Sequence, residues 1–179
     1  PKIQIHWKVE DGSRVKSGDK ICGLKGNTKT IVTAERAALN FLQILSATAT
    51  QTSYLVSLIN STNAKLLDTR KTIPGLRKAQ KYAVKCGGGV NHRMGLYDCI
   101  MLKENHILST GSLEQLIKNA INQFPKTPII VEVESLEELQ SALLMKGIKR
   151  ILCDNFSLQD LREAVKISDG ICSLEASGG

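Results

Sequence analysis

The sequence predicts an α/β protein in which helices cover a parallel sheet, preceded by a smaller region of β structure and a long helix. Three observations support this class. Short apolar runs alternate with helical patterns through most of the chain after residue 65. The intervals between several of these runs are long enough for the helical crossovers that parallel strands require. The first part of the chain is instead divided by closely spaced turn residues, which is typical of small β structure.

The first 31 residues predict strands and turns, and the segment 9–21, VEDGSRVKSGDKI, is expected to form a strand, turn, strand unit. The turn signals are Asp11-Gly12, Ser17-Gly18, Gly23 and Gly26-Asn27. Thr33 is the expected N-cap of a long helix that starts at Ala34, because apolar residues then recur at helical spacing as far as Ile59. This helix should lead out of the first region.

Five apolar runs after this helix predict the strands of the sheet. They cover residues 65–67, 99–102, 129–133, 150–153 and 170–174. Ser135 and Ser157 are expected to cap helices over 136–145 and 158–165, which lie between the last three runs. Periodicity leaves open whether the sheet is open or closed into a barrel. In both arrangements, the residues at the carboxyl ends of the strands face the ligand site.

Composition excludes several classes of protein. The chain is 42% hydrophobic and 23% charged, as in ordinary globular proteins, and no apolar run approaches the roughly 20 residues that span a bilayer. No signal-peptide pattern is present, so we expect a cytosolic protein without membrane contact. Five cysteines without a C-x-x-C pair argue against disulfides and zinc. The chain starts without Met and ends in a glycine pair, so we expect a fragment of a longer protein.

Positive charge is concentrated in one segment. Residues 65–106 contain nine Lys or Arg and three Asp or Glu, so this segment carries +6 of the chain's net +7. A nucleic-acid-binding module is one explanation, and it predicts binding that weakens steeply with salt. However, the chain has only three Phe, three Tyr and one Trp for base stacking, and no nucleic-acid-binding motif. A small polyanionic substrate is the favoured interpretation, with no nucleic-acid partner.

Several cations follow predicted strands or a glycine-rich loop, and we expect them to bind this anion. They are Arg70, Lys71, His92, Arg93 and Lys103. Two guanidinium forks beside point charges suit a substrate with two carboxylates. For Arg70 and Arg93 a solvated surface role stays equally open. For four cations on a predicted helix the solvated surface is preferred, namely Arg77, Lys78, Lys81 and Lys85.

Acidic and small residues at later strand ends suggest a metal and a phosphate site. Glu132 and Asp154 lie at or near the ends of neighbouring strands, where two carboxylates suit Mg²⁺ shared with a phosphorylated substrate. Other acids nearby can simply complement a helix dipole. Ser177, Gly178 and Gly179 form a plausible phosphate cradle if a helix follows. The triplet Gly87–Gly89 is weak support for close approach to a ligand, because it has no nucleotide-binding spacing.

The motifs that carry these residues resemble the quinolinate phosphoribosyltransferase family. The matching segments are TAERAALNFLQILSATAT (33–50), DTRKTIPGLR (68–77), KYAVKCGGGVNHRMGLYDCIMLKENHI (81–107), VEVESLEEL (131–139), CDNFSLQDLREAV (153–165) and LEASGG (174–179). The resemblance implies an N-terminal α/β sandwich domain and a C-terminal α/β barrel-like domain. On this basis residues 1–60 are expected to be the end of the sandwich and its long helix. Residues 61–179 are then an incomplete barrel without its last strands.

The resemblance also implies a reaction. Quinolinate and phosphoribosyl pyrophosphate would give nicotinate mononucleotide, pyrophosphate and CO₂, which is the entry of quinolinate into NAD synthesis. Arg36 from the partner subunit would join Arg70, Lys71, His92, Arg93 and Lys103 around the quinolinate carboxylates. Lys71, Glu132 and Asp154 would be the catalytic residues. Glu132 and Asp154 would also serve the ribose and Mg²⁺, and Ser177, Gly178 and Gly179 the 5-phosphate.

The implied assembly is a homodimer with active sites shared between subunits, and whether dimers build a hexamer is left open. A related phosphoribosyltransferase for another aromatic acid, such as nicotinate, is the alternative. That alternative should need fewer cations for carboxylate binding, so the paired arginines favour the diacid.

Overall fold

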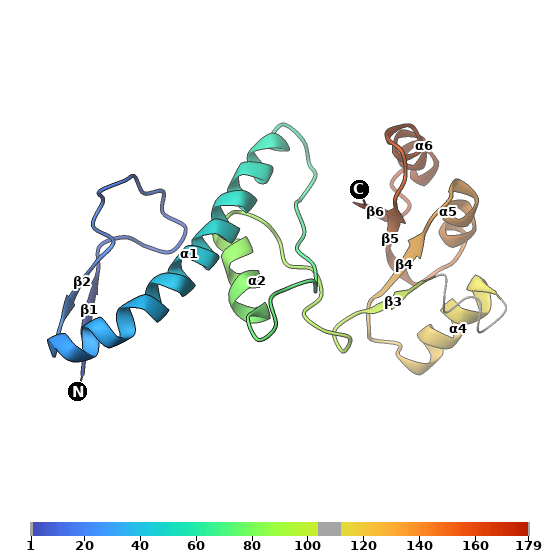
Figure 1. Cartoon of the computed structure of the whole chain (residues 1–179). Coiled ribbons are helices and arrows are strands. Elements are labelled where there is room, and N and C mark those ends of the chain that lie inside the picture. Colours follow the sequence, from blue (N-terminus) through green and yellow to red (C-terminus); the bar gives the residue numbers. More distant parts are fainter. Residues whose placement is uncertain (1, 104–111, 179) are drawn as a thin grey trace. The chain divides into compact units, whose positions relative to one another are not determined.

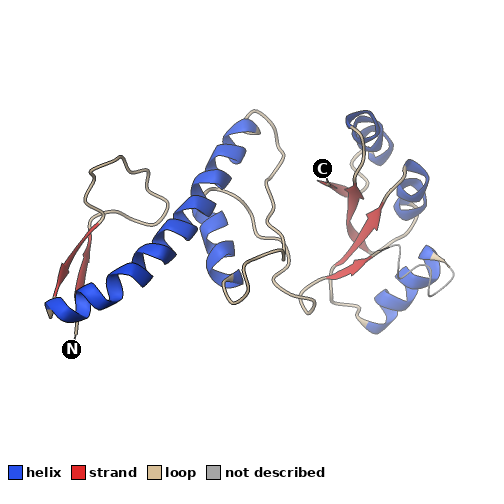
Figure 2. Ribbon diagram, in the orientation of Figure 1, coloured by secondary structure: helices blue, strands red, loops and turns tan. Residues whose placement is uncertain are grey.

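The computed structural model describes residues 2–103 and 112–178. The chain forms two compact units, Pro1–Met94 and Gly95–Gly179. Figures 1 and 2 show the helices and strands of each unit. The division at residue 60 that the resemblance implies stays a prediction. Among the described residues, no helix combines the length and apolar character needed to cross a membrane.

The first unit begins with a two-stranded antiparallel hairpin. Strand β1 (Gln4–Trp7) pairs with β2 (Cys22–Lys25), and Gln4 lies opposite Lys25. The expectation of a strand, turn, strand unit over 9–21 is wrong, because this segment is the long connection between the two strands. Two tight turns occupy it, with Ser13 N donating to Glu10 O at 3.1 Å and Asp19 N to Lys16 O at 3.1 Å. The turns leave no extended stretch to pair.

Helix α1 (Thr28–Leu58) leads out of the hairpin, as expected, but starts earlier than predicted. Asn27 is the N-cap, and its side-chain oxygen accepts a hydrogen bond from Thr30 N at 3.1 Å. The assignment of Thr33 as the cap is therefore wrong. The Thr33 hydroxyl instead donates to Lys29 O at 2.7 Å, inside the helix.

The first unit also contains helix α2 (Arg77–Cys86), which contacts α1. The expected strand over 65–67 is reduced to a single parallel bridge between Leu67 and Val90. Two backbone hydrogen bonds define this bridge, from Val90 N to Leu66 O at 2.8 Å and from Asp68 N to Val90 O at 3.1 Å. The bridge sets side by side the two segments that continue to the candidate site.

The second unit is a four-stranded parallel sheet with the order β3-β4-β5-β6. Its strands are β3 (Ile100–Leu102), β4 (Ile129–Val133), β5 (Ile148–Asp154) and β6 (Ser173–Ser177). Its helices are α4 (Leu113–Gln123), α5 (Leu136–Leu143) and α6 (Leu158–Ser168). The predicted alternation of parallel strands and helices is confirmed. Closure of the sheet into a barrel stays a prediction.

The helices cover one face of this sheet (Figure 1), and the core lies between them and the strands. Val131, Val133, Ile151 and Cys153 point to this face and are buried against Leu139 and its neighbours on the helices. Each fully buried aliphatic side chain of this kind contributes about 1.5–3 kcal/mol. The alternate strand positions face the other way, where Met101, Ile130 and Leu152 form a small cluster with Cys99. This second face carries the polar residues at the strand ends.

Both predicted serine caps in this unit are confirmed. Ser135 Oγ accepts from Glu138 N at 3.2 Å, and Ser157 Oγ accepts from Asp160 N at 3.1 Å. A Glu138 carboxylate oxygen accepts in turn from Glu134 N at 2.8 Å, one residue before the usual position in a capping box. These caps fix where α5 and α6 begin, and so where the chain leaves β4 and β5.

Candidate functional site

A buried carboxylate organises the candidate anion-binding segments of the first unit. Asp68 follows the bridge residue Leu67, and its side chain is 7% exposed. One oxygen, Oδ1, accepts from Lys81 Nζ and from the backbone N–H of His92 at 2.7 Å. The other, Oδ2, accepts from Asn91 Nδ2 at 2.5 Å. These hydrogen bonds compensate the buried negative charge within the fold. Asp68 therefore holds the neighbouring residues in place.

His92 is oriented by the neighbouring backbone. Its Nδ1 accepts a hydrogen bond from Arg93 N at 2.7 Å, so the ring proton of the neutral imidazole lies on Nε2. Nε2 is therefore the nitrogen suited to donate to a carboxylate oxygen. The segment that carries His92 and Arg93 is held in place by Asp68 and Lys81.

The preference for a solvated surface is wrong for two of the four cations on α2. Lys81 is 1% exposed and forms an ion pair with Asp68. Arg77 is half-buried, and its guanidinium donates to Arg70 O at 3.1 Å, Met94 O at 3.3 Å and Thr72 Oγ1 at 3.3 Å. Lys78 and Lys85 are less buried than Lys81 and carry no ion pair within the described part of the chain. Arg77 and Lys81 are more buried than Lys78 and Lys85 because they lie on the helix face that meets the segments after Leu67 and Val90.

The proposed anion ligands of the first unit come from the segments just after Leu67 and Val90. Arg70 and Lys71 follow Asp68, and their side chains make no hydrogen bond or ion pair with any other described residue. His92 and Arg93 follow Val90. The structure thus brings four of the predicted residues into neighbouring segments. Arg36 lies on α1 and is exposed.

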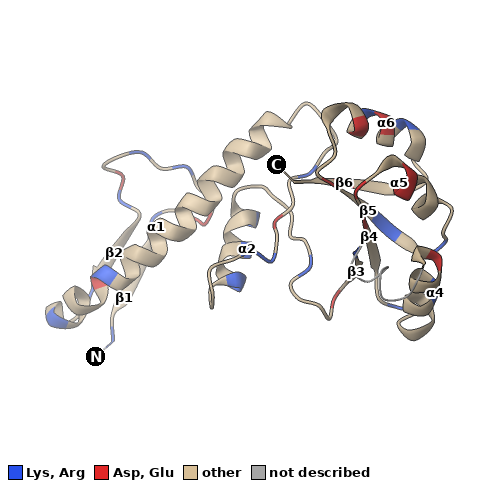
Figure 3. Ribbon diagram, turned by 45° about the vertical axis from the view of Figure 1, so that its right-hand side comes forward, with Lys and Arg blue, Asp and Glu red and all other residues tan. Residues whose placement is uncertain are grey.

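The second unit places Lys103, Glu132, Asp154 and Ser177 on neighbouring strand ends of the sheet. In the register Glu132 lies opposite Leu152, and Asp154 lies opposite Ser177. Because side chains two residues apart point to the same face, Glu132 and Asp154 both project from the face opposite the helices. Lys103 directly follows β3. Figure 3 shows how charged positions are distributed over the strands and helices.

Lys103 and Glu132 form an ion pair. Lys103 Nζ lies 2.8 Å from Oε1 and 2.6 Å from Oε2 of Glu132, so the ammonium bridges both oxygens. The Lys103 side chain is 44% exposed and that of Glu132 is 13% exposed, so the cation is the accessible partner. An anion at Lys103 would therefore lie next to a carboxylate that the same ammonium neutralises.

A second charge pair on this face was missed by sequence reasoning. Arg150 Nη1 lies 2.8 Å from Glu175 Oε1, on the neighbouring strands β5 and β6. This pair can be recognised only from the strand register, in which Arg150 lies opposite Ser173 and Glu175 is two residues further along β6. The missed residues of the first unit, Asp68, Lys81 and Asn91, likewise depend on contacts between distant segments.

The two predicted metal ligands, Glu132 and Asp154, are carboxylates, which suit Mg²⁺, but they are only two ligands. Asp154 Oδ2 accepts from Asn155 Nδ2 at 3.1 Å, and Glu132 is bridged by Lys103. Within 2–103 and 112–178, no group of three or more His, Cys, Asp or Glu gathers in a way that would hold a metal ion. Mg²⁺ normally keeps several waters and uses one or two carboxylates with substrate phosphates. Two carboxylates are compatible with that pattern, and Glu132 and Asp154 as Mg²⁺ ligands stay a prediction.

Gly178 directly follows β6, and its backbone has a local structural reason, while the phosphate cradle of Ser177, Gly178 and Gly179 stays a prediction. Gly178 has φ +108°, and a Cβ there would lie 2.7 Å from Asn155 N. Asn155 N also donates to Ser177 O at 2.8 Å, so the β5–α6 loop lies directly against this position. Glycine is required at 178 by both the conformation and the close approach. Gly179 and the segment 104–111 lie outside the described residues.

The glycine triplet has a packing role in the structure. A Cβ at Gly87 would lie 2.6 Å from Thr52 Cβ, and one at Gly89 would lie 2.9 Å from Thr52 Cγ2. Thr52 is buried on α1. The absence of side chains thus lets the end of α2 approach α1, which explains two of the three glycines without a ligand.

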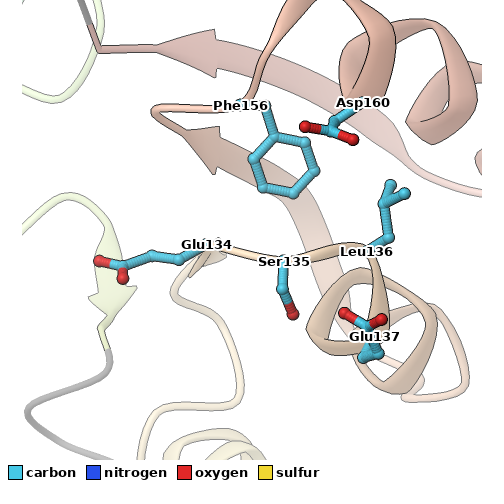
Figure 4. Close-up of a pocket in the computed structure, with 6 residues that line it drawn as sticks. All are labelled: Glu134, Ser135, Leu136, Glu137, Phe156 and Asp160. Atoms are coloured by element: carbon cyan, nitrogen blue, oxygen red, sulfur yellow. The ribbon is translucent and has the colours of Figure 1, made fainter.

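A cavity of about 250 Å³ lies between the first turns of α5 and α6 (Figure 4). Its lining is acidic, with Glu134, Glu137 and Asp160, together with the Phe156 ring. The cap serines already use their hydroxyls on backbone N–H groups. This cavity therefore does not provide the cations that the predicted substrate requires.

Comparison with known proteins matches the whole chain to one family in two parts. Residues 1–46 match the family model described as the quinolinate phosphoribosyl transferase N-terminal domain, and residues 48–179 match that of the C-terminal domain.

Individual relatives agree with these matches. The chain is 41% identical to nicotinate-nucleotide pyrophosphorylase [carboxylating] from Mycobacterium leprae, covering 98% of the chain and 63% of the relative. It is 39% identical to quinolinate phosphoribosyltransferase [decarboxylating] 2b, mitochondrial, from Nicotiana tabacum, covering 99% and 55%. The solved nicotinate-nucleotide pyrophosphorylase from Francisella tularensis is 49% identical, with a TM-score of 0.95 over 98% of this chain and 62% of that one. The chain thus spans less than two thirds of the length of these relatives.

Proposed function

Because this chain belongs to the quinolinate phosphoribosyltransferase family, we propose that the protein is a glycosyltransferase that joins quinolinate to the ribosyl carbon of phosphoribosyl pyrophosphate. The ring nitrogen forms a bond to the anomeric carbon as the bond to pyrophosphate breaks. Loss of CO₂ then leaves its electron pair on the ring carbon, which takes a proton to give nicotinate mononucleotide. The observation that carries the proposal is the family match together with Arg70 and Lys71, whose charges no described residue neutralises.

The cationic residues of the first unit bind the dianion in this proposal. Arg70 offers a fork for one carboxylate, Lys71 adds a point charge, and His92 donates from Nε2. Arg93 contributes further positive charge, and Lys103 of the second unit is proposed as an additional ligand. This charge also stabilises the negative ring carbon that CO₂ loss leaves behind, because it is fixed before the reaction.

The carboxylates of the second unit serve the ribosyl group. Positive charge develops on the anomeric carbon as pyrophosphate leaves, and Glu132 and Asp154 offer negative charge from one sheet face. Glu132 and Asp154 would hold Mg²⁺, which would neutralise the departing pyrophosphate. Ser177, Gly178 and Gly179 are proposed for the 5-phosphate.

We also propose a homodimer in which Arg36 reaches the partner's site. Its support is the surface of α1, where apolar side chains near Arg36 are left to solvent: Val32 is 61% exposed and Phe41 is 52% exposed. A cytosolic location stays a prediction, since the name of the tobacco relative places that protein in mitochondria.

We propose that the +6 segment, residues 65–106, binds a small anion and not a nucleic acid, and the contacts of three of its cations support this. Lys81 is paired with Asp68 and Lys103 with Glu132, and Arg77 is bound to backbone carbonyls. Three of the cations therefore serve internal contacts. This distribution favours a small anion over a polyanionic strand.

The test is product formation by the intact protein from quinolinate and phosphoribosyl pyrophosphate, with and without Mg²⁺. We expect nicotinate mononucleotide only when Mg²⁺ is present. Arg70→Ala should lower kcat/KM for quinolinate by about 100-fold or more, because a bidentate carboxylate contact is lost. Lys78→Ala, on the exposed side of α2, is the matched control and should behave as wild type. Equal turnover with nicotinate would instead favour the alternative substrate.

A further inference from the structure

We propose that Arg77 and Lys81 are positioning residues for quinolinate binding, acting through the backbone of the residues that touch the substrate. The inference rests on the function proposed above and adds two residues to it. Both side chains project from one face of α2, four residues apart. Neither needs to contact quinolinate.

Each cation binds the main-chain carbonyl of a proposed quinolinate ligand. Arg77 Nη2 donates to Arg70 O at 3.1 Å, and Lys81 Nζ donates to His92 O at 3.0 Å. These two carbonyls belong to different segments, one after Leu67 and one after Val90. One helix face therefore sets the position of both segments at the residues that matter for binding.

Further contacts fix each segment at a second point. Arg77 also donates to Thr72 Oγ1 at 3.3 Å and to Met94 O at 3.3 Å, so one guanidinium spans both segments. Lys81 pairs with Asp68, which in turn accepts from His92 N at 2.7 Å. Asn91 Nδ2 closes the network by donating to Lys81 O at 2.8 Å.

These contacts contribute to substrate binding as well as to stability. Arg70 and His92 are fixed at their backbone, so their side chains start from a set position when the dianion arrives. Displacement of such groups by about 1 Å can cost about 100-fold in rate. An ordinary surface cation would have no such effect. Lys78, on the same helix, provides that comparison.

The experiment measures kcat and KM for each substrate separately in the intact protein. We expect Arg77→Ala to raise KM for quinolinate about 10- to 100-fold, because the Arg70 and His92 segments lose their common support. KM for phosphoribosyl pyrophosphate should change less than about twofold. Arg77→Lys keeps the charge without the fork and should recover only part of the loss. Lys78→Ala should match wild type in both constants.

A second variant tests Lys81 without leaving a buried charge alone. Asp68→Asn combined with Lys81→Met removes both charges while keeping similar volumes, so folding is expected to survive. Its KM for quinolinate should also rise, while its circular dichroism stays that of wild type.

The outcomes separate this inference from the proposed function. If wild type makes product but Arg77→Ala and the double variant behave as Lys78→Ala, the positioning role is wrong and the function stands. A proportionate loss for both substrates, with a lower melting temperature, would show a purely structural role and also overturn the inference. If wild type makes no product, the proposed function itself has failed.

Discussion

The Asp68 carboxylate accepts hydrogen bonds from Lys81, Asn91 and His92, which lie 13, 23 and 24 residues later in the chain. Sequence reasoning assigns Lys81 to a solvated helix face, since lysine is almost never fully buried without a partner. The partner lies 13 residues earlier in the chain, and only the fold makes the pairing visible. Burial of this pair links the helix to the segments proposed to bind the substrate.

Tyr82 provides a pH-dependent test at the residue scale. Its hydroxyl donates to Asp11 Oδ2 at 2.8 Å, and this hydrogen bond and the Asp11 charge raise the pKa of Tyr82 to about 12 from 10.0. Because the folded pKa is the higher one, the stabilisation is complete below pH 10 and is lost as pH rises through about 12.

Ultraviolet absorbance of the phenolate, taken as the difference between wild type and Tyr82→Phe, should show this late titration. Asp11→Asn should return the pKa towards 10.0, and Glu10→Gln is the matched control. A midpoint near 10.0 in the wild type would show that the contact is absent in solution.

Cysteine reactivity tests the core at the same scale. Burial raises the pKa of the Cys153 thiol to about 11, and its side chain is fully covered by the helices. We expect iodoacetamide to modify Cys153 much more slowly than the half-buried Cys22, because the thiolate is the reactive form. Mass spectrometry of peptides from the folded protein measures both rates. Equal rates would contradict the described packing of β5.

At the scale of elements, the parallel strands were the most predictable part. The apolar run 129–133 coincides with β4, and Ser135 and Ser157 cap the helices that follow β4 and β5. The elements of the first unit were less predictable. Asn27 and Thr33 are both acceptable caps by residue type, and the paired segments of the hairpin are short and largely exposed. Local signals were therefore ambiguous there.

Packing of α5 on the sheet gives a prediction about stability. Leu139 is 0% exposed within the core, and Leu139→Ala should lower the free energy of unfolding by about 2–5 kcal/mol. Leu144 immediately follows the helix and is 80% exposed, so Leu144→Ala should change that free energy by no more than about 0.5 kcal/mol. Urea denaturation followed by circular dichroism measures both. Similar losses for the two variants would contradict the burial of Leu139 between α5 and the sheet.

At the scale of the whole molecule, the sequence indicates the kind of substrate better than it indicates the arrangement of the residues at the site. The charge excess and the order of strand-end residues point to a polyanionic substrate before any fold is known. The resemblance of the motifs to the family then implies a diacid. The supporting contacts of Arg77, Lys81 and Arg150 follow only from register and helix packing, because they join residues from separate segments. The sequence thus indicated which residue types the site uses, but not which residues they contact.

The most direct test of the account is the stoichiometry of the reaction in the intact protein. Quinolinate labelled on the carboxylate that is lost should release labelled CO₂ in an amount equal to the nicotinate mononucleotide formed, and only with phosphoribosyl pyrophosphate present. Equal amounts of the two products would establish phosphoribosyl transfer coupled to decarboxylation. Product formed from nicotinate without CO₂, or no product from quinolinate in a folded protein, would contradict the central claim.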